Sequence, residues 1–99
     1  MTTDKLSKTP RRRQATERAV MIYLTRNFSQ PYGLRYTTAI QWHCRHGIIG
    51  QHFTDVEVFN ALRRLQRRGV IDSWTDESRG WYRRRVWYVI RPNDDDVSQ

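Results

Sequence analysis

Three histidines and the only cysteine fall within ten residues near the middle of the chain: His43, Cys44, His46 and His52. Imidazole nitrogens and a thiolate are ligands that zinc prefers, and a Cys–His pair is also the basis of thiol catalysis. The spacing lacks the paired ligands of zinc frameworks, and no third orienting group or glycine-rich oxyanion segment accompanies the pair. We therefore expect no metal, no cofactor and no enzymatic activity.

Arginine is the second residue type with chemistry to offer. Lys and Arg number 18 against 10 Asp and Glu, which gives a net charge of +8. A planar guanidinium suits phosphate groups and guanine edges, and a chain this basic favours a polyanionic partner. The arginines that concern us form three clusters: Arg11, Arg12 and Arg13; Arg63, Arg64 and Arg67; and Arg79, Arg83, Arg84 and Arg85.

Secondary-structure elements position these clusters, and the sequence predicts where those elements lie. Residues 1–13 are polar and end in the first cluster, so we predict a flexible basic arm. A helix is expected from Gln14 or Thr16 to about Phe28, because its apolar residues recur at helical spacing. The breaker residues 29–33 end it.

A second helix is predicted after a short extended segment at residues 34–36. Its sequence, TTAIQWHCRH, covers residues 37–46, with Thr37 or Thr38 as its cap and Gly47 closing it. The stretch GIIGQHF then forms a turn. A third helix begins after Thr54 or Asp55 and ends at Gly69. Its inner face is formed by Val58, Leu62 and Leu65, which recur at i, i+4 and i+7.

From residue 70 the period changes to two, which predicts a β-hairpin. VIDSWT forms the first strand, DESRG a loop and WYRRRVWYVI the second strand. One pairing sets Asp72 opposite Arg84 and places Trp81 and Trp87 on the outer face. That pairing groups on the other face Val70, Trp74, Tyr82, Val86, Tyr88 and Ile90. Residues 92–99 are expected to be an acidic, disordered tail.

This order of elements, together with the segments VEVFNALRRLQRRGVI and RGWYRRRVWYVI, resembles the winged helix-turn-helix superfamily. The resemblance extends over residues 14–91 and is closest between 54 and 90. It implies an α+β fold, a small winged helix-turn-helix with three helices followed by a two-stranded β-hairpin wing. The first segment is similar to the superfamily's recognition helix and the second to its wing.

The resemblance also implies a mode of DNA binding, with the third helix in the major groove and the wing on the backbone or in the minor groove. On the helix side opposite the core, Asn60 is expected to pair with adenine and Arg63 with guanine. Glu57 could accept a hydrogen bond from cytosine, and Phe59 either touches a thymine methyl or stacks inside the protein. Phosphates are assigned to Thr54, Arg64, Arg67 and the cations of the wing and arm.

We therefore expect a sequence-specific double-stranded DNA-binding protein, a transcriptional regulator of phage, plasmid or bacterial type. A homodimer is expected through Met21 and Ile22 of the first helix, with Trp81 and Trp87 as the alternative surface. Two other readings stay open: an accessory factor in replication, partition or recombination, and a winged helix that contacts protein. One cysteine allows no internal disulfide and no segment is apolar enough to span a membrane, so a cytoplasmic location is expected.

Overall fold

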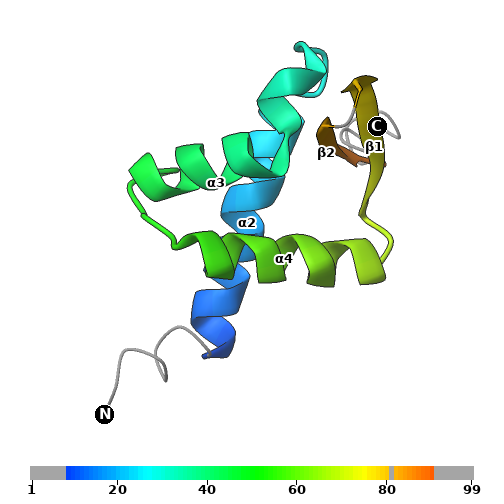
Figure 1. The fold of residues 1–99 in the computed structure, drawn as a ribbon. Helices are drawn as coiled ribbons and strands as arrows, with labels where there is room; N and C mark the ends of the chain where they lie inside the picture. Colours follow the sequence, from blue (N-terminus) through cyan, green and yellow to red (C-terminus); the bar gives the residue numbers. More distant parts are fainter. Residues whose placement is uncertain (1–8, 81, 91–99) are drawn as a thin grey trace.

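The computed structural model describes residues 9–80 and 82–90. Within them, three α-helices and a short 3-10 helix precede an antiparallel two-stranded hairpin, so the predicted α+β winged-helix fold is confirmed (Figure 1). In chain order the elements are α2 (Pro10–Arg26), η1 (Tyr32–Arg35), α3 (Thr37–His46), α4 (Asp55–Arg67), β1 (Ile71–Arg79) and β2 (Tyr82–Val89). The predicted acidic tail and residues 1–8 of the predicted arm lie outside the described residues.

Helix α2 begins four residues earlier than Gln14, the first start that the sequence pattern indicated. Thr9 is its N-cap, and the Thr9 hydroxyl accepts a hydrogen bond from the Arg12 backbone N–H at 3.2 Å. Pro10 follows at the first helical position, where its missing N–H costs nothing and its fixed φ favours the helix. The arginine cluster assigned to the flexible arm is therefore part of the first turn of a helix.

The core lies where the three α-helices meet the inner face of the hairpin. The predicted inner face of α4 is confirmed, because Val58, Leu62 and Leu65 are all buried. Helix α2 contributes Val20 and Leu24 to the same cluster. Each such side chain stabilises the fold by about 1.5–3 kcal/mol through removal of apolar surface from water. The core therefore fixes which side of α4 faces outward.

Helix α3 has the predicted bounds but not the predicted cap. Its N-cap residue is Tyr36, which makes no side-chain capping hydrogen bond. Gly47 ends the helix at φ +126°, and a Cβ there would lie 3.2 Å from the His52 ring. In the turn that follows, Ile48 and Gln51 exchange two backbone hydrogen bonds of 2.8 and 2.9 Å. This turn leads the chain from α3 back to the start of α4.

Strand β1 ends later than predicted, β2 is slightly shorter than predicted, and the register of the hairpin differs. Residues assigned to a loop continue β1 to Arg79, so that Asp72 pairs with Tyr88 and Asp76 pairs with Arg84. The predicted pairing of Asp72 with Arg84 is wrong, because the strands turn at Gly80 and the register shifts between Asp76 and Arg79. Register depends on turn geometry, which the alternating pattern alone does not determine.

Trp87 belongs to the inner face, so the prediction that it lies outside is wrong. It is fully buried, and its indole N–H donates a hydrogen bond of 2.7 Å to the Thr37 hydroxyl. Ile71 and Val89 are buried on the same face. Trp74 lies on the opposite face and is half-exposed, and Trp81 lies outside the described residues.

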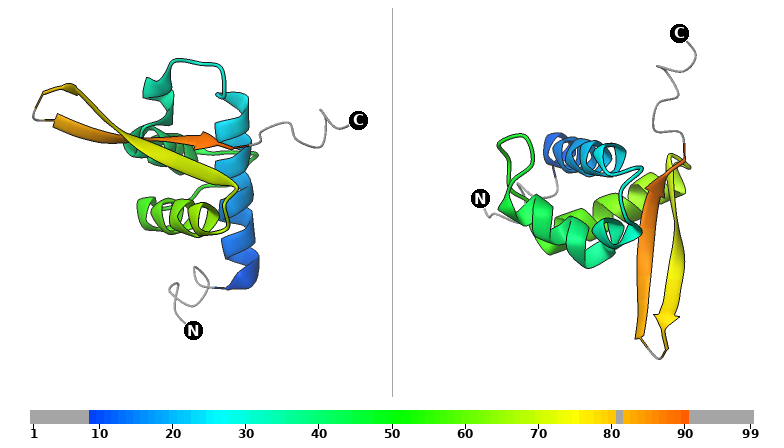
Figure 2. Two further views of the ribbon diagram at one scale, coloured as in Figure 1. Left: turned by 90° about the vertical axis from the view of Figure 1, so that its right-hand side faces the viewer. Right: turned by 90° about the horizontal axis from the view of Figure 1, so that it is seen from above.

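A brace from η1 supports the outer face of the hairpin. Residues 34–36, predicted as extended, are the end of η1 followed by Tyr36, which forms an isolated β-bridge with Val86. The Tyr36 hydroxyl donates to the Asp76 carboxylate at 2.5 Å, and the Tyr32 and Trp74 rings lie 5.2 Å apart. In both views of Figure 2 the braced hairpin extends beyond α4, on the side away from α2.

Candidate nucleic-acid interface

The start of α4 is held by a reciprocal pair of hydrogen bonds. The Thr54 hydroxyl accepts from the Glu57 backbone N–H at 3.2 Å, and the Glu57 carboxylate accepts from the Thr54 backbone N–H at 2.9 Å. This is a capping box, which satisfies amide groups that a helix start leaves without partners. The spacing Thr-Asp-Val-Glu is the sequence signal for it, and our prediction of base contact for Glu57 overlooked that signal.

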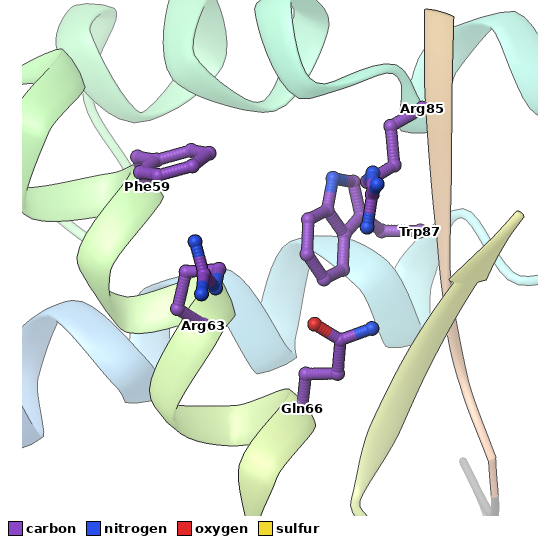
Figure 3. Close-up of a pocket in the computed structure, with 5 residues that line it drawn as sticks. All are labelled: Phe59, Arg63, Gln66, Arg85 and Trp87. Carbon is purple, nitrogen blue, oxygen red and sulfur yellow. The ribbon is translucent and has the colours of Figure 1, made fainter. Parts of the chain in front are cut away.

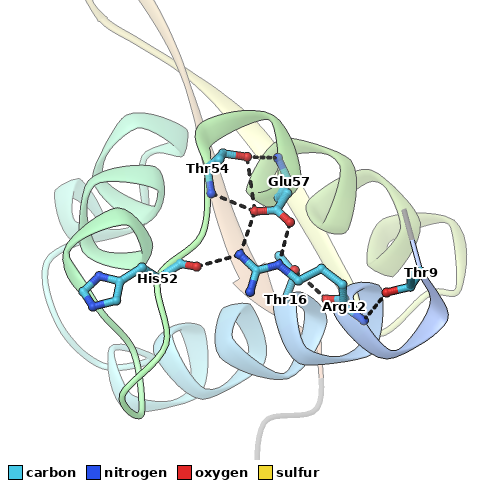
Figure 4. Close-up of polar contacts among 6 residues, drawn as sticks. All are labelled: Thr9, Arg12, Thr16, His52, Thr54 and Glu57. Carbon is cyan, nitrogen blue, oxygen red and sulfur yellow. Dashed lines mark hydrogen bonds and ion pairs between the residues drawn. The ribbon is translucent and has the colours of Figure 1, made fainter. Parts of the chain in front are cut away.

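Arg12 of α2 closes over the same carboxylate (Figure 4). Its guanidinium donates to both Glu57 oxygens, at 2.7 and 3.0 Å, and to the His52 carbonyl at 2.7 Å. It also lies 4.5 Å above the centre of the Phe53 ring. The Glu57 side chain is only 8% exposed. Glu57 therefore faces inward with both carboxylate oxygens engaged, and Arg12 commits its Nε and one terminal nitrogen to groups of the protein.

The Arg12 guanidinium and the Thr54 backbone N–H lower the pKa of Glu57 below its ordinary value, although burial opposes them. The same ion pair raises the pKa of Arg12. Glu57 therefore carries its negative charge at neutral pH, and the N-terminus of α4 is neutralised from within the protein. A negative charge in the first turn also suits the helix dipole.

Glu17 forms a second ionic link between α2 and α4, this time with arginines of α4. Its carboxylate contacts Arg64 Nε at 2.5 Å and Arg68 at 2.9 Å. Burial raises the pKa of Glu17, but the two arginines outweigh it and the net pKa is lowered. Arg64, predicted to bind phosphate, is thus engaged by α2 instead.

The opposite side of α4 carries a row of exposed side chains, which we call the outer stripe: Val56, Phe59, Asn60, Arg63 and Arg67. These positions are three and four residues apart, so they lie on one face of the helix. Among the described residues neither arginine of the stripe forms an ion pair; Arg63 contacts only the Phe59 ring, with its guanidinium 5.8 Å from the ring centre. The outer stripe is therefore open to a partner.

A pocket of about 330 Å³ joins the outer stripe to the hairpin (Figure 3). Phe59, Arg63 and Gln66 line it from α4, and Arg85 and Trp87 line it from β2. No carboxylate is among these lining residues. Two guanidinium groups from different elements thus line one open hollow, which is an arrangement suited to an anion.

The wing cations are divided between the two faces of β2. Arg83 and Arg85 lie four and two residues before Trp87 and therefore share its face of the strand, whereas Arg84 lies on the other face, 5.0 Å from the Tyr36 ring centre. Arg83 is exposed, with Glu77 at 3.8 Å, and Arg85 donates to the Ser73 hydroxyl at 3.2 Å. The side chain of Arg79, a predicted wing contact, lies outside the described part of the structure.

Of the other predicted residues, Arg11 and Arg13 are exposed on the first turn of α2, at the end of the molecule away from the hairpin (Figure 1). Thr54 uses its hydroxyl as a cap. The structure thus places Arg63 and Arg85 on one pocket, and Asn60 and Arg67 on the same helix face as Arg63, whereas Arg12 of the first cluster is engaged by Glu57. Sequence reasoning missed Gln66, which lies three residues after Arg63 and lines the same pocket.

The residues considered for a metal site have separate environments. Cys44 is buried in the core, and this burial raises the pKa of its thiol to about 11. The His46 ring stacks on Trp42 at 3.9 Å, and His52 bonds the Arg45 carbonyl at 3.0 Å. Among residues 9–80 and 82–90, no three His, Cys, Asp or Glu side chains converge on a position for a metal ion.

Two further predictions concern surfaces. Met21 and Ile22, the predicted dimer surface, are partly buried and pack against the core. None of the helices in the described part of the chain has the length and apolar character needed to cross a membrane. Comparisons with protein-family models, with curated proteins and with solved structures found no significant match to this chain.

Proposed function

We propose that this protein binds double-stranded DNA, with the outer stripe of α4 in the major groove and the hairpin along the adjacent backbone. The observation that carries the proposal is the pocket that Arg63 of α4 and Arg85 of β2 both line, with no carboxylate among its lining residues. A phosphate of the backbone is a ligand that matches this pair of guanidinium groups.

The distribution of charge supports a polyanionic partner. Every carboxylate among the described residues engages a group inside the protein: Glu17, Asp55, Glu57, Asp72, Asp76 and Glu77. Arg63, Arg67 and Arg85 form no ion pair within the described part of the chain. The acidic groups are therefore engaged within the protein, which leaves these exposed cations available to a polyanion.

The shape around the outer stripe also fits a duplex. A major groove about 12 Å wide admits one α-helix, with the N-terminal residues of that helix against the base edges. The hairpin extends past α4 on the side away from α2 (Figure 2). A duplex placed against α4 therefore meets β2 on its flank, where Arg83 and Arg85 face it.

Within this proposal, regulation of transcription and a homodimer stay predictions. A second copy would double the contacts on a palindromic site, because one helix and one wing read few base pairs. Met21 and Ile22 pack against the core, so a dimer through α2 would use only the exposed remainder of these side chains. Sedimentation at micromolar concentration tests this, with roughly twice the chain mass of 12.0 kDa expected.

The decisive experiment is a titration of a labelled random-sequence duplex at several salt concentrations. Binding should weaken steeply with salt, because each phosphate that an arginine neutralises releases condensed counterion. The double variant Arg63→Ala/Arg85→Ala should lower both the affinity and the salt dependence. Arg18→Ala is the matched control, because Arg18 is an exposed arginine of α2 that forms no ion pair with the described residues. Binding that is flat with salt, or unaffected by the double variant, contradicts the proposal.

A further inference from the structure

The outer stripe begins with two apolar side chains that the core does not use. Val56 is 68% exposed and Phe59 is 40% exposed. They are three residues apart, on the first and second turns of α4, and therefore share a face. The other apolar residues of the helix are buried. An exposed Val and Phe side by side on a helix that otherwise sorts apolar from polar residues indicate contact with an apolar group.

The charged neighbours of this pair are neutralised by the protein itself. The Asp55 carboxylate contacts Arg45 at 2.7 Å, and the Glu57 carboxylate is enclosed by Arg12. Asn60, the next residue of the outer stripe, is uncharged, and the cations begin with Arg63. The stripe is therefore apolar and neutral at its N-terminal half and cationic at its C-terminal half.

This division matches the two chemistries of a duplex. Cations suit phosphates, whereas the major-groove edge of DNA offers one apolar group, the C5 methyl of thymine. The N-terminal residues of a helix in the groove are the ones that reach base edges. The flanking Arg63 and Arg67 supply charge complementarity to DNA on the same face, which favours DNA over a protein as the occupant.

We propose that Val56 and Phe59 read thymine C5 methyl groups on neighbouring base pairs, an inference that rests on the proposed DNA binding. Val56 and Phe59 are separated by a rise of about 4.5 Å along the helix axis, which is similar to the spacing of about 3.4 Å between successive bases of one DNA strand. The Phe59 ring is also in contact with the Arg63 guanidinium. The methyl-reading pair is thus coupled to the cation that faces the pocket.

The test replaces thymidine with deoxyuridine, which removes the methyl and keeps every hydrogen-bonding group. Duplexes that bind best are first selected from a random-sequence pool of thymidine-containing duplexes. The winning duplex is then remade with deoxyuridine at one thymine at a time. We expect affinity to fall about fourfold at each of one or two adjacent positions, as burial of one methyl group implies.

Protein variants assign the effect to its residues. Val56→Ala should bind the thymidine and deoxyuridine duplexes equally at one position, and Phe59→Ala should do so at the neighbouring one. Both side chains are exposed, and circular dichroism checks that each variant folds. Val70→Ala, an exposed valine outside the stripe, should keep the full preference for thymidine.

The outcomes separate this inference from the proposed function. Tight, salt-dependent binding with no preference for thymidine over deoxyuridine overturns methyl reading and leaves DNA binding intact. A preference that survives both Val56→Ala and Phe59→Ala also overturns it, and so does an equal loss on both kinds of duplex, which indicates backbone or protein contact. Absence of binding to any duplex at low salt overturns the proposed function itself.

Discussion

Arg63 and Arg64 are neighbours in the sequence, yet they lie on different faces of α4, about 100° apart, and have different surroundings. Arg64 forms an ion pair with Glu17 of α2. A second ion pair between the same two helices joins Glu57, near the start of α4, to Arg12. Arg63 lies on the outer stripe and contacts only an aromatic ring. An arginine-rich helix thus carries two populations of cations, and the facing helix, not the residue type, decides which of them can bind a ligand.

The comparison is tested most strongly by removing Glu57. Glu57→Ala loses the capping box and leaves the Arg12 charge partly buried without its partner, so the free energy of unfolding should fall by about 2–3 kcal/mol. Arg63→Ala should change it by less than about 0.5 kcal/mol. Urea unfolding followed by tryptophan fluorescence measures both, and Asp55→Ala, which breaks an exposed ion pair, is the control. Equal losses for Glu57→Ala and Arg63→Ala would remove the distinction between the two sides.

Binding should show the reverse order. Arg63→Ala should weaken duplex binding about tenfold and lower the slope of log affinity against log salt by about one, since one phosphate contact is lost. Arg64→Ala should leave that slope unchanged, although the protein loses some stability. Titrations of one duplex at four salt concentrations compare the two variants. A larger change in slope for Arg64→Ala than for Arg63→Ala contradicts our assignment.

Acid should remove the stabilisation that the Glu57–Arg12 ion pair gives to the fold. The pKa of Glu57 is lower in the folded protein than its ordinary 4.5, so its stabilisation is complete above that pH and is lost as the pH falls through the folded pKa. Wild type should therefore exceed Glu57→Gln in stability by a constant amount, about 1–2 kcal/mol, from pH 6 to 8. The difference should shrink below pH 4.5. A difference that is the same at pH 3 and pH 7 would mean that the Glu57 charge contributes nothing.

The smallest expected effect concerns the core behind both sides. Burial raises the pKa of the Cys44 thiol to about 11, so little thiolate exists at pH 8 and the sulfur is shielded. Labelling by a thiol reagent should be much slower in the native protein than in urea. Arg63→Ala should leave this protection unchanged, whereas Glu57→Ala should shorten it because global opening becomes more frequent. Rapid labelling of the native wild type would show that the core opens at Cys44.

Most of the scaffold was predictable from local signals. The bounds of α3 follow from Gly47, and the start of α4 follows from Thr54 and the apolar period behind it. The start of α2 was signalled by Thr9 and Pro10, a cap followed by proline, but the polar composition of the segment concealed it. Local signals of this kind act within one turn of helix, which is why a single sequence carries them.

The surroundings of the candidate site residues were predictable only in part, because they depend on partners that are far away in the sequence. Glu57 and Arg64 were assigned to DNA, yet their ion-pair partners lie 45 and 47 residues away on α2. The face of Trp87 depended on a hairpin register that shifts between Asp76 and Arg79. Periodicity places a residue on a face of its own element. It does not say which other element covers that face.

The bond from Tyr36 to Asp76 has a consequence for the thermodynamics of association. A mobile hairpin would lose conformational entropy on binding a partner. Here the hairpin is already fixed in the unbound protein, because Tyr36 bonds Asp76 of β1 and forms a β-bridge with Val86 of β2. Docking should therefore proceed nearly as a rigid body, and its heat-capacity change should reflect only the surface covered, without the added contribution of a segment that orders as it binds.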